Sequence, residues 1–192
     1  MTEPGREAPR PLHDHSAAQA ELVVRPIGII RTPFQSMEGT PIQAVFGGGA
    51  EAQAILEPIF EEALRDIEGF ERVWLVYWID RAGPFRAEVV PYRDDRPRGL
   101  FATRAPSRPN PLGISVVRLI GREGCVLRLA DVDVLDGTPL LDIKPYGPAF
   151  DAFPDARAGG LDEPGTRRTV ADSRFGRASG ADQPNNDPKQ GE

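Results

Sequence analysis

The chain has 192 residues, of which 20 are glycine and 20 proline, so about one residue in five interrupts regular structure. With 40% hydrophobic and 27% charged residues, this composition argues against a long helical bundle or a coiled coil. The net charge of −6 argues against a protein that holds nucleic acid by overall positive charge, and the apolar run at residues 74–79 is too short to span a bilayer.

Composition divides the chain into a core and two polar tails. Residues 1–21 and 152–192 lack hydrophobic periodicity, which is typical of mobile or loosely attached segments. The first residues carry no apolar stretch of a secretory signal, and the single Cys125 cannot form an internal disulfide, so we expect a cytoplasmic protein. Residues 22–151 hold nearly all the β-branched and aromatic residues and are predicted to form one domain.

The N-terminal part of this domain predicts three strands and one short helix. The first strand, over residues 22–31, carries Pro26, which puts that position at an edge or a bulge. A short strand is plausible over residues 52–56, and a helix over 59–68 is bounded by a proline near its first turn and a glycine after its end. Residues 73–79 form a near-continuous apolar run, which predicts a central strand covered on both faces.

A β-hairpin is the clearest element of the C-terminal part. Two apolar strands, residues 114–120 and 125–134, flank a Gly-Arg-Glu-Gly turn at 121–124. Further short strands are plausible over residues 87–90 and 140–143. Many short strands with one or two short helices predict a mostly all-β fold, a small closed or partly closed antiparallel β-barrel.

Charge is unevenly distributed within the domain. Residues 81–128 contain ten basic and four acidic residues, whereas residues 22–80 contain four basic and nine acidic residues. The basic middle predicts an anion-facing patch, although arginines on the solvated outer faces of strands explain the pattern equally well.

Residues 99–113, with the sequence GLFATRAPSRPNPLG, predict a stiff, extended loop. Three prolines fix φ and remove three backbone donors, which excludes a regular central strand. Arg104 and Arg108 project from this loop, and a guanidinium on a rigid backbone suits a carboxylate or phosphate ligand. Asn110 either ties the turn together or reads a ligand edge. The alternative is a stiffened connector whose arginines form internal ion pairs.

A second dense segment covers residues 132–146. The sequence Asp-Gly-Thr-Pro from Asp136 predicts a turn between two apolar runs, where the carboxylate has a capping role or a chemical one. Three carboxylates and one lysine lie close together in this segment, but no histidine or cysteine accompanies them. The turn is therefore favoured over a metal site, and no metal is predicted.

Familiar catalytic constellations are missing from the core. His13 and His15 both lie in the N-terminal tail, so Ser-His-Asp and Cys-His systems lack a histidine. Cys125 begins an apolar strand and is interpreted as a small core residue. The three glycines at 47–49 are not followed by the Lys-Ser/Thr of a phosphate loop. Hydrolases, kinases and ordinary dinucleotide enzymes are therefore disfavoured.

Several motifs, in consistent order, resemble one known family. They are GIIRTPF from Gly28, PIQA from Pro41, GFERVW from Gly69, FATRAPSRPNPLG from Phe101 and DGTPLLDIKPY from Asp136. Together they resemble the TsaA-like family, also called TrmO or YaeB, over essentially the whole of residues 22–151. The resemblance implies a small β-barrel methyltransferase, usually a homodimer, that uses S-adenosylmethionine to methylate N6-threonylcarbamoyladenosine beside the anticodon of transfer RNA (tRNA).

The same resemblance implies a cofactor site built from separated segments. The residues that it assigns to S-adenosylmethionine are Gln43, Ala44, Val45, Asp80, Arg81, Arg104, Ala105, Ser115, Val134, Leu135, Asp136 and Gly137. Arg104 is expected to pair with the cofactor carboxylate, and Asp136 or Asp80 to accept from its ammonium or ribose. Asp80 is also a candidate to take a proton from the acceptor nitrogen, with water as the alternative. The candidates for facing the RNA are Arg108, Asn110, Lys144 and Tyr146.

Departures from the family pattern leave the acceptor open. Residues 105–107 and Asp80 differ from what many relatives carry, and the polar tail shows no trace of the C-terminal domain of longer bacterial enzymes. Three hypotheses follow. The protein is a methyltransferase for tRNA docked on residues 81–128, with salt-sensitive affinity, a methyltransferase for a small-molecule amine or amide, or a non-catalytic S-adenosylmethionine-binding module.

Overall fold

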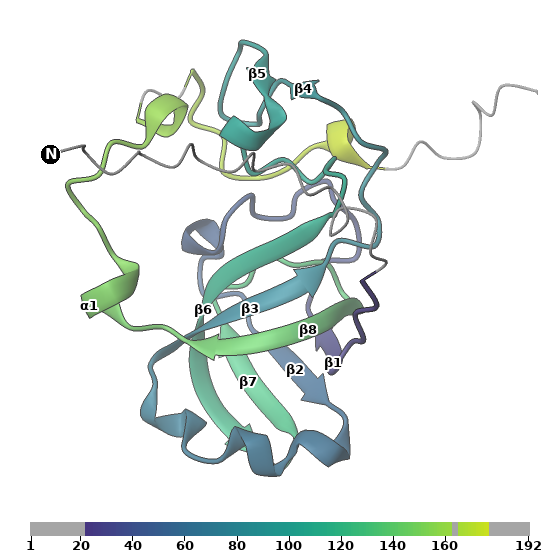
Figure 1. Cartoon of the computed structure of the whole chain (residues 1–192), viewed down its shortest axis with the longest axis vertical. Helices are drawn as coiled ribbons and strands as arrows, with labels where there is room; N and C mark the ends of the chain where they lie inside the picture. The colour runs from purple at the N-terminus through teal and green to yellow at the C-terminus, as the bar shows by residue number, and fades with distance from the viewer. Residues whose placement is uncertain (1–21, 163–164, 177–192) are drawn as a thin grey trace, which may run out of the picture.

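Within the residues that this computed structural model describes, 22–162 and 165–176, six strands close into an antiparallel β-barrel (Figure 1). Around the barrel their order is β1-β2-β7-β6-β3-β8. Their bounds are β1 Gly28–Arg31, β2 Ala52–Leu56, β3 Arg72–Trp78, β6 Leu112–Glu123, β7 Val126–Ala130 and β8 Thr138–Pro145. Because each strand pairs on both sides, closure leaves no free sheet edge in this barrel. The predicted β-barrel is confirmed.

Alternating side chains fill the interior of the barrel. On β3, Val73, Leu75 and Tyr77 are buried, whereas the side chains between them are only partly covered. The prediction that this strand is covered on both faces is therefore wrong, because in a closed barrel one face of each strand lines the interior and the other faces outward. The apolar outer face of β3 made the run look like a fully buried strand.

The first predicted strand is right only in its last four residues. Residues 22–27 lie outside β1, and Pro26 precedes the point where the ladder begins with the hydrogen bond from Ile27 N to Leu140 O (2.8 Å). A proline has no N–H to donate, so the ladder starts after it.

The predicted hairpin exists with different limits. β6 continues to Glu123, so the turn is shorter than residues 121–124 and uses Gly124, whose φ is +56°. β7 ends at Ala130 instead of residue 134, because Asp131 adopts a φ of +61° and leaves the strand conformation.

The predicted helix over residues 59–68 is wrong as a continuous element. The segment forms three 3₁₀ helices, η3 (Pro58–Phe60), η4 (Glu62–Leu64) and η5 (Ile67–Gly69). Asp66, with a φ of +69°, interrupts the helical geometry before η5. A short α-helix that the sequence did not predict, α1, covers Pro148–Asp151, and the remaining 3₁₀ helices are η2 (Ala44–Phe46), η6 (Leu100–Ala102), η7 (Gly159–Leu161) and η8 (Ser173–Phe175).

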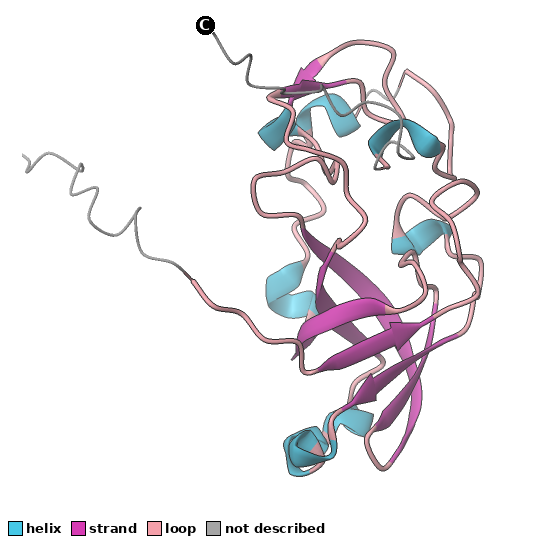
Figure 2. Ribbon diagram, turned by 90° about the vertical axis from the view of Figure 1, so that its right-hand side faces the viewer, coloured by secondary structure: helices cyan, strands magenta, loops and turns pink. Residues whose placement is uncertain are grey.

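A second, smaller sheet lies beyond one end of the barrel, as Figures 1 and 2 show. It pairs β4 (Glu88–Val89) with β5 (Arg98–Gly99), so the strand expected over residues 87–90 exists but does not belong to the barrel. Val89, Leu100 and Phe175 form a separate hydrophobic cluster beneath this sheet.

The segment 165–176 packs on the domain although the sequence placed it in a loosely attached tail. Phe175 is only 3% exposed, and its ring meets Tyr92 edge-on at 5.0 Å between centroids. Backbone hydrogen bonds join this segment to residues 39–42 and to Gly83, whose N–H donates to Phe175 O (2.9 Å). The predicted boundary at residue 151 therefore leaves part of the packed structure outside the domain.

Candidate functional site

Most of the predicted cofactor residues gather at one end of the barrel, which we call the mouth. Because all neighbouring strands are antiparallel, the ends of β1, β3 and β7 and the starts of β2, β6 and β8 meet at this end. Three connecting segments belong to it: η2 with Gln43, the residues Asp80 and Arg81 after β3, and the turn at 134–137 before β8. Closure of the barrel therefore brings together segments that lie about 90 residues apart in the sequence.

The turn at 134–137 is held by the residues that leave β1. Asp136 Oδ1 accepts from Thr32 N (3.0 Å), and its other oxygen faces Arg31 (3.3 Å). The hydrogen bond from the Thr32 amide holds the pKa of Asp136 below its ordinary value, and the charge of Arg31 adds a smaller effect in the same direction. Gly137 has a φ of +76° and donates its N–H to Ile30 O (2.8 Å). These contacts favour the turn-forming role of Asp136, which the sequence had left open.

Arg81 connects the end of β3 to the same turn. Its Nη2 donates to Asp136 O (2.7 Å) and to Thr138 Oγ1 (3.2 Å). Its Nε lies 3.3 Å from Asp80 Oδ1, and the Asp80 side chain is 40% exposed. Arg81 therefore stabilises the turn by direct hydrogen bonds, and Asp80 lies at the surface of the mouth with its charge paired.

A buried hydrogen-bonded chain reaches the mouth from inside the barrel. Tyr77 OH lies 3.0 Å from Ser115 Oγ, which donates to Asp133 Oδ1 (2.6 Å). Burial raises the pKa of Asp133 to about 6, although the Ser115 hydroxyl and the charge of Arg104 oppose the shift. Burial also raises the pKa of the Tyr77 phenol, with the charge of Asp133 adding to the effect. This hydrogen-bonded chain ends at the mouth in the Asp133 carboxylate, which forms no ion pair within the described residues.

Sequence reasoning missed Asp133 and Tyr77. Asp133 stands between the buried residues Val132 and Val134, so a carboxylate interrupting an apolar run was the available signal. Tyr77 lies opposite Gly113 on β6, and a Cβ on that glycine would lie 2.0 Å from the tyrosine ring. The glycine that ends the Arg-Pro-Asn-Pro-Leu-Gly motif therefore makes room for the ring that holds Ser115.

Arg104 is the free cation of this site. Its Nη1 donates to Gln43 Oε1, its side chain is exposed, and within the described part of the chain it forms no ion pair. Its charge acts on the pKa of both Asp133 and Tyr77, which puts the guanidinium near the buried chain. The structure therefore places Gln43 and Arg104, two residues that the resemblance assigns to the cofactor, beside the chain that contains Ser115 and Asp133.

Other predicted residues contribute through the backbone or face elsewhere. Ala105 is 7% exposed and packs in the hydrophobic cluster beneath β4 and β5. Val134 is 2% exposed, and its carbonyl accepts from Thr32 Oγ1 (2.8 Å). Val45, in contrast, is 81% exposed on η2. Ala44 belongs to η2, next to Val45, and Leu135 belongs to the turn, next to Val134.

The four RNA-facing candidates do not lie together. Arg108 Nη1 donates to Thr103 O (3.0 Å), and its guanidinium lies over the Phe101 ring. These contacts stay within its own loop. They are made to a carbonyl and a ring, whereas the sequence had suggested internal ion pairs as one alternative. Asn110 is exposed on the same loop. Lys144 and Tyr146 lie at the other end of β8, roughly 20 Å from the mouth at the strand's rise per residue. The structure therefore separates this last pair from the candidate site.

The predicted cofactor residues combine exposed and buried side chains, since Val45 and Arg104 are exposed whereas Ser115 and Val134 are buried. Two prominent surface cavities of the described region, of about 420 and 370 Å³, are lined by other residues. Residues 22–162 and 165–176 contain no group of three or more His, Cys, Asp or Glu side chains placed to hold a metal ion. In the same ranges no helix has the length and apolar character needed to cross a membrane.

Comparison with known proteins decides the family. Residues 29–152 match the family model described as the tRNA-methyltransferase O N-terminal domain. The chain belongs to this family. The resemblance drawn from the motifs of the tRNA-methyltransferase O family is thereby confirmed.

Relatives share both sequence and fold with this chain. A probable S-adenosyl-L-methionine-binding protein of Pyrococcus abyssi is 51% identical over 142 residues, which cover 74% of this chain and 77% of the relative. The tRNA (adenine(37)-N6)-methyltransferase of Escherichia coli is 35% identical over 69% of this chain and 60% of its own length. A crystal structure of TrmO from Pseudomonas aeruginosa matches with a TM-score of 0.66 at 42% identity, over 76% of this chain and 65% of that one. The chain thus spans less than two thirds of the E. coli relative and of this crystal structure.

Proposed function

We propose that this protein transfers a methyl group from S-adenosylmethionine to N6 of threonylcarbamoyladenosine beside the anticodon of tRNA. The proposal rests on the arrangement of charged side chains at the mouth of the barrel, in a chain that belongs to the tRNA-methyltransferase O family. There an unpaired guanidinium, Arg104, lies near the buried carboxylate of Asp133. Membership of the family alone would leave open whether this chain keeps the site.

The charges at the mouth fit the cofactor. S-adenosylmethionine carries a carboxylate, an ammonium and a positively charged sulfonium. Arg104 is suited to the carboxylate, because within the described residues its side chain has a hydrogen bond only to the neutral Gln43 side chain. Asp133 is suited to the cationic part, because burial raises its pKa and a bound cation would relieve that cost.

Bound S-adenosylmethionine supplies an electrophilic methyl group, and the chain's residues position it. Arg81 and Thr32 hold the turn at 134–137 from two sides. Tyr77 and Ser115 fix the direction of the Asp133 carboxylate. Methyl transfer depends on in-line placement of two reactants, so this rigidity contributes to rate without a nucleophilic side chain.

The acceptor nitrogen gives up a proton during N-methylation, and Asp80 is the proposed acceptor. Its side chain is 40% exposed at the end of β3, where a substrate at the mouth can reach it. Its neighbour Arg81 orients the carboxylate, with Nε donating to Asp80 Oδ1 (3.3 Å). The protein is proposed to act in the cytoplasm, where tRNA is available.

We further propose that the active form is a homodimer that covers part of the mouth. Large apolar side chains are exposed near it, with Val45 81%, Phe101 77% and Ile114 54% accessible. An open site with an apolar border is expected to be completed by a second copy. Sedimentation should then give twice the chain mass, and Ile114→Glu should shift the protein to monomer; a wild-type monomer at micromolar concentration would contradict the dimer.

The methylation proposal is tested with purified protein, methyl-labelled cofactor and tRNA that carries threonylcarbamoyladenosine. Nucleoside mass spectrometry should show one added methyl group on that nucleoside. Arg104→Ala should weaken cofactor binding by about tenfold in calorimetry, since a charge-assisted hydrogen bond is lost. Arg65→Ala is the matched control, because Arg65 is 71% exposed and lies at the opposite end of the barrel.

Each outcome decides a separate part of the proposal. Cofactor binding with no methyl group on any tRNA nucleoside would contradict the proposal that tRNA is the acceptor. Label in a small amine or amide would identify the alternative substrate. Cofactor binding with no transfer to a whole-cell extract would make the protein a binding module. Absence of cofactor binding would overturn the assignment of the mouth.

A further inference from the structure

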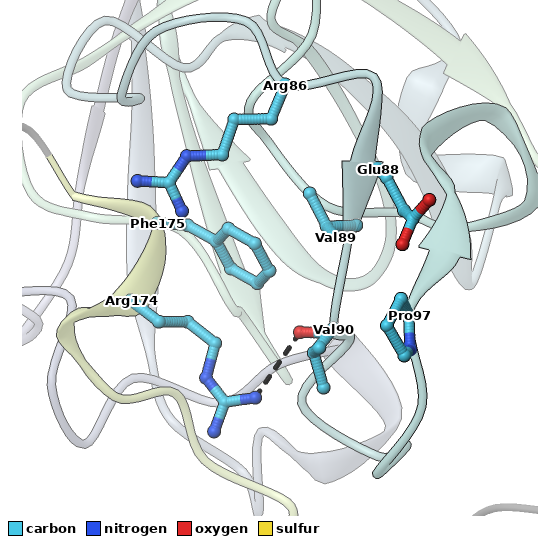
Figure 3. Close-up of a pocket in the computed structure, with 7 residues that line it drawn as sticks. All are labelled: Arg86, Glu88, Val89, Val90, Pro97, Arg174 and Phe175. Atoms are coloured by element: carbon cyan, nitrogen blue, oxygen red, sulfur yellow. Dashed lines mark hydrogen bonds between the residues drawn. The ribbon is translucent and has the colours of Figure 1, made fainter.

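A surface cavity of about 420 Å³ lies between the small β4–β5 sheet and the segment that ends in η8 (Figure 3). Its apolar walls are Val89, Val90, Pro97 and Phe175. Arg86 and Arg174 lie on one side of it and flank the Phe175 ring, whereas Glu88 points to the other side of β4. The cavity therefore combines apolar surface with two cationic groups and the single carboxylate of Glu88, and none of its residues belongs to the predicted cofactor site.

The two arginines differ in how they are held. Arg174 is fixed: its Nη2 and Nε donate to Asp172 (2.7 and 2.9 Å), its Nη1 to Val90 O (3.3 Å), and its guanidinium lies over Tyr92. Asp172 also pairs with Arg168 (2.9 Å), so this cluster has one positive charge in excess.

Arg86 is free by comparison. Its side chain is exposed, and within the described residues it forms no ion pair. Arg81, Arg98 and Arg118 of the basic stretch 81–128 each pair with an aspartate. Arg86 belongs to the arginines of that stretch that form no ion pair within the described residues, so its charge is available to an anionic ligand.

Backbone hydrogen bonds connect the walls of the cavity to segments that lead to the mouth. Gly83 N donates to Phe175 O (2.9 Å), and Gly83 lies two residues from Arg81, which bonds to the turn at Asp136. Two residues span at most about 7 Å between Cα atoms. On the other side, Arg86 N donates to Ser107 O (3.1 Å), on the loop that carries Arg104. These two links place the cavity next to the segments that carry the mouth.

We propose that the cavity binds a nucleotide of the RNA substrate next to the one that is methylated. Its phosphodiester faces Arg86, and its base lies against Val90 and Pro97, because bases of single-stranded RNA bind apolar and aromatic surfaces and guanidinium groups suit phosphate. The volume of about 420 Å³ accommodates one nucleotide. This inference rests on the proposed function, since it assumes an RNA acceptor.

The test compares two arginine variants for binding of an anticodon-arm RNA by fluorescence anisotropy. Arg86→Gln should weaken binding by about tenfold and lower the dependence of log K on log salt by about 0.7, as for one lost phosphate contact. Arg65→Gln removes the same charge at the far end of the barrel and should leave both values unchanged. Calorimetric affinity for S-adenosylmethionine should be the same in both variants and the wild type.

A wall substitution and two competitors complete the experiment. Val90 is 37% exposed, so Val90→Glu should fold normally and reduce RNA binding at least as much as Arg86→Gln. A dinucleotide should compete with the RNA better than inorganic phosphate at equal concentration. If phosphate competes equally well, the cavity is a simple anion site and the inference is overturned.

The two levels of the argument fail in different ways. If the wild type does not bind the anticodon-arm RNA, the tRNA acceptor of the proposed function is wrong. If it binds and Arg86→Gln behaves as Arg65→Gln does, the RNA proposal stands and the nucleotide cavity does not. Loss of RNA binding in Arg86→Gln with unchanged cofactor affinity supports the cavity.

Discussion

Neutralising Asp133 is expected to stabilise the free protein. Burial raises the pKa of this carboxyl from 3.8 to about 6. At about 1.4 kcal/mol for each pH unit, the charged form costs the folded state about 3 kcal/mol. Asp133→Asn removes the charge and keeps the size and one oxygen for Ser115 Oγ, but its amide nitrogen cannot accept the backbone hydrogen bond that the carboxylate receives from Ala44. The loss of this bond subtracts about 1 kcal/mol, so the variant should still be more stable than the wild type at neutral pH, although cofactor binding weakens.

The direction of the change in stability with pH follows from proton binding. Between pH 3.8 and about 6 the folded protein binds this proton more tightly than the unfolded chain does. The wild type therefore loses stability as pH rises through this window, and the full cost is present above it. The difference in unfolding free energy between variant and wild type should approach about 2 kcal/mol near pH 8 and decrease below about pH 4, where the wild-type carboxyl is protonated.

Urea denaturation of both proteins at the two pH values is the assay. Comparison with the wild type cancels the titration of all other groups. Asp142→Asn is the control, because Asp142 is 46% exposed and paired with Lys144, and its effect should stay within about 0.5 kcal/mol. A less stable Asp133→Asn protein near pH 8, or a difference that does not change with pH, would refute the reasoning about burial.

Three further substitutions probe the site and its supports. Gly113→Ala places a Cβ 2.0 Å from the buried Tyr77 ring and should lower the free energy of unfolding by about 1–3 kcal/mol in urea titrations. Arg81→Lys keeps the charge but not the planar fork that bonds to Asp136 O, and calorimetry should show about tenfold weaker cofactor binding. Phe175→Ala empties the cluster beneath β4 and β5, at a cost of about 3–5 kcal/mol, and should expose residues 165–176 to hydrogen exchange before the barrel.

Matched controls separate these effects from general loss of stability. Gly99→Ala has no heavy atom within 4 Å of the new Cβ and should be close to neutral. Arg65→Lys at the far end of the barrel should leave cofactor affinity unchanged. Phe153 is 74% exposed, so Phe153→Ala should not change exchange at residues 165–176. Equal effects in a control and its partner would contradict the corresponding contact.

Local sequence chemistry predicted much of the architecture. Short runs rich in apolar and β-branched residues located β2, β3, β6 and β8, because such residues favour strands. The helix at 59–68 failed because Asp66, in a left-handed conformation, interrupts it, and propensity in a short window does not reveal that break. The fully covered strand at β3 failed because an apolar outer face looks the same in sequence as a buried one.

The sequence by itself determined the barrel class, the stiff loop around Arg104, the glycine-dependent turn at Gly137 and the family, because these follow from residues close together or from long motifs. Only the tertiary structure decided that Asp133, Ser115 and Tyr77 form one chain beside Arg104. It also placed Lys144 and Tyr146 far from the mouth and packed residues 165–176 over the domain. The reason is that strand register and barrel closure set the distances between residues far apart in the chain, and neither is encoded in a local pattern.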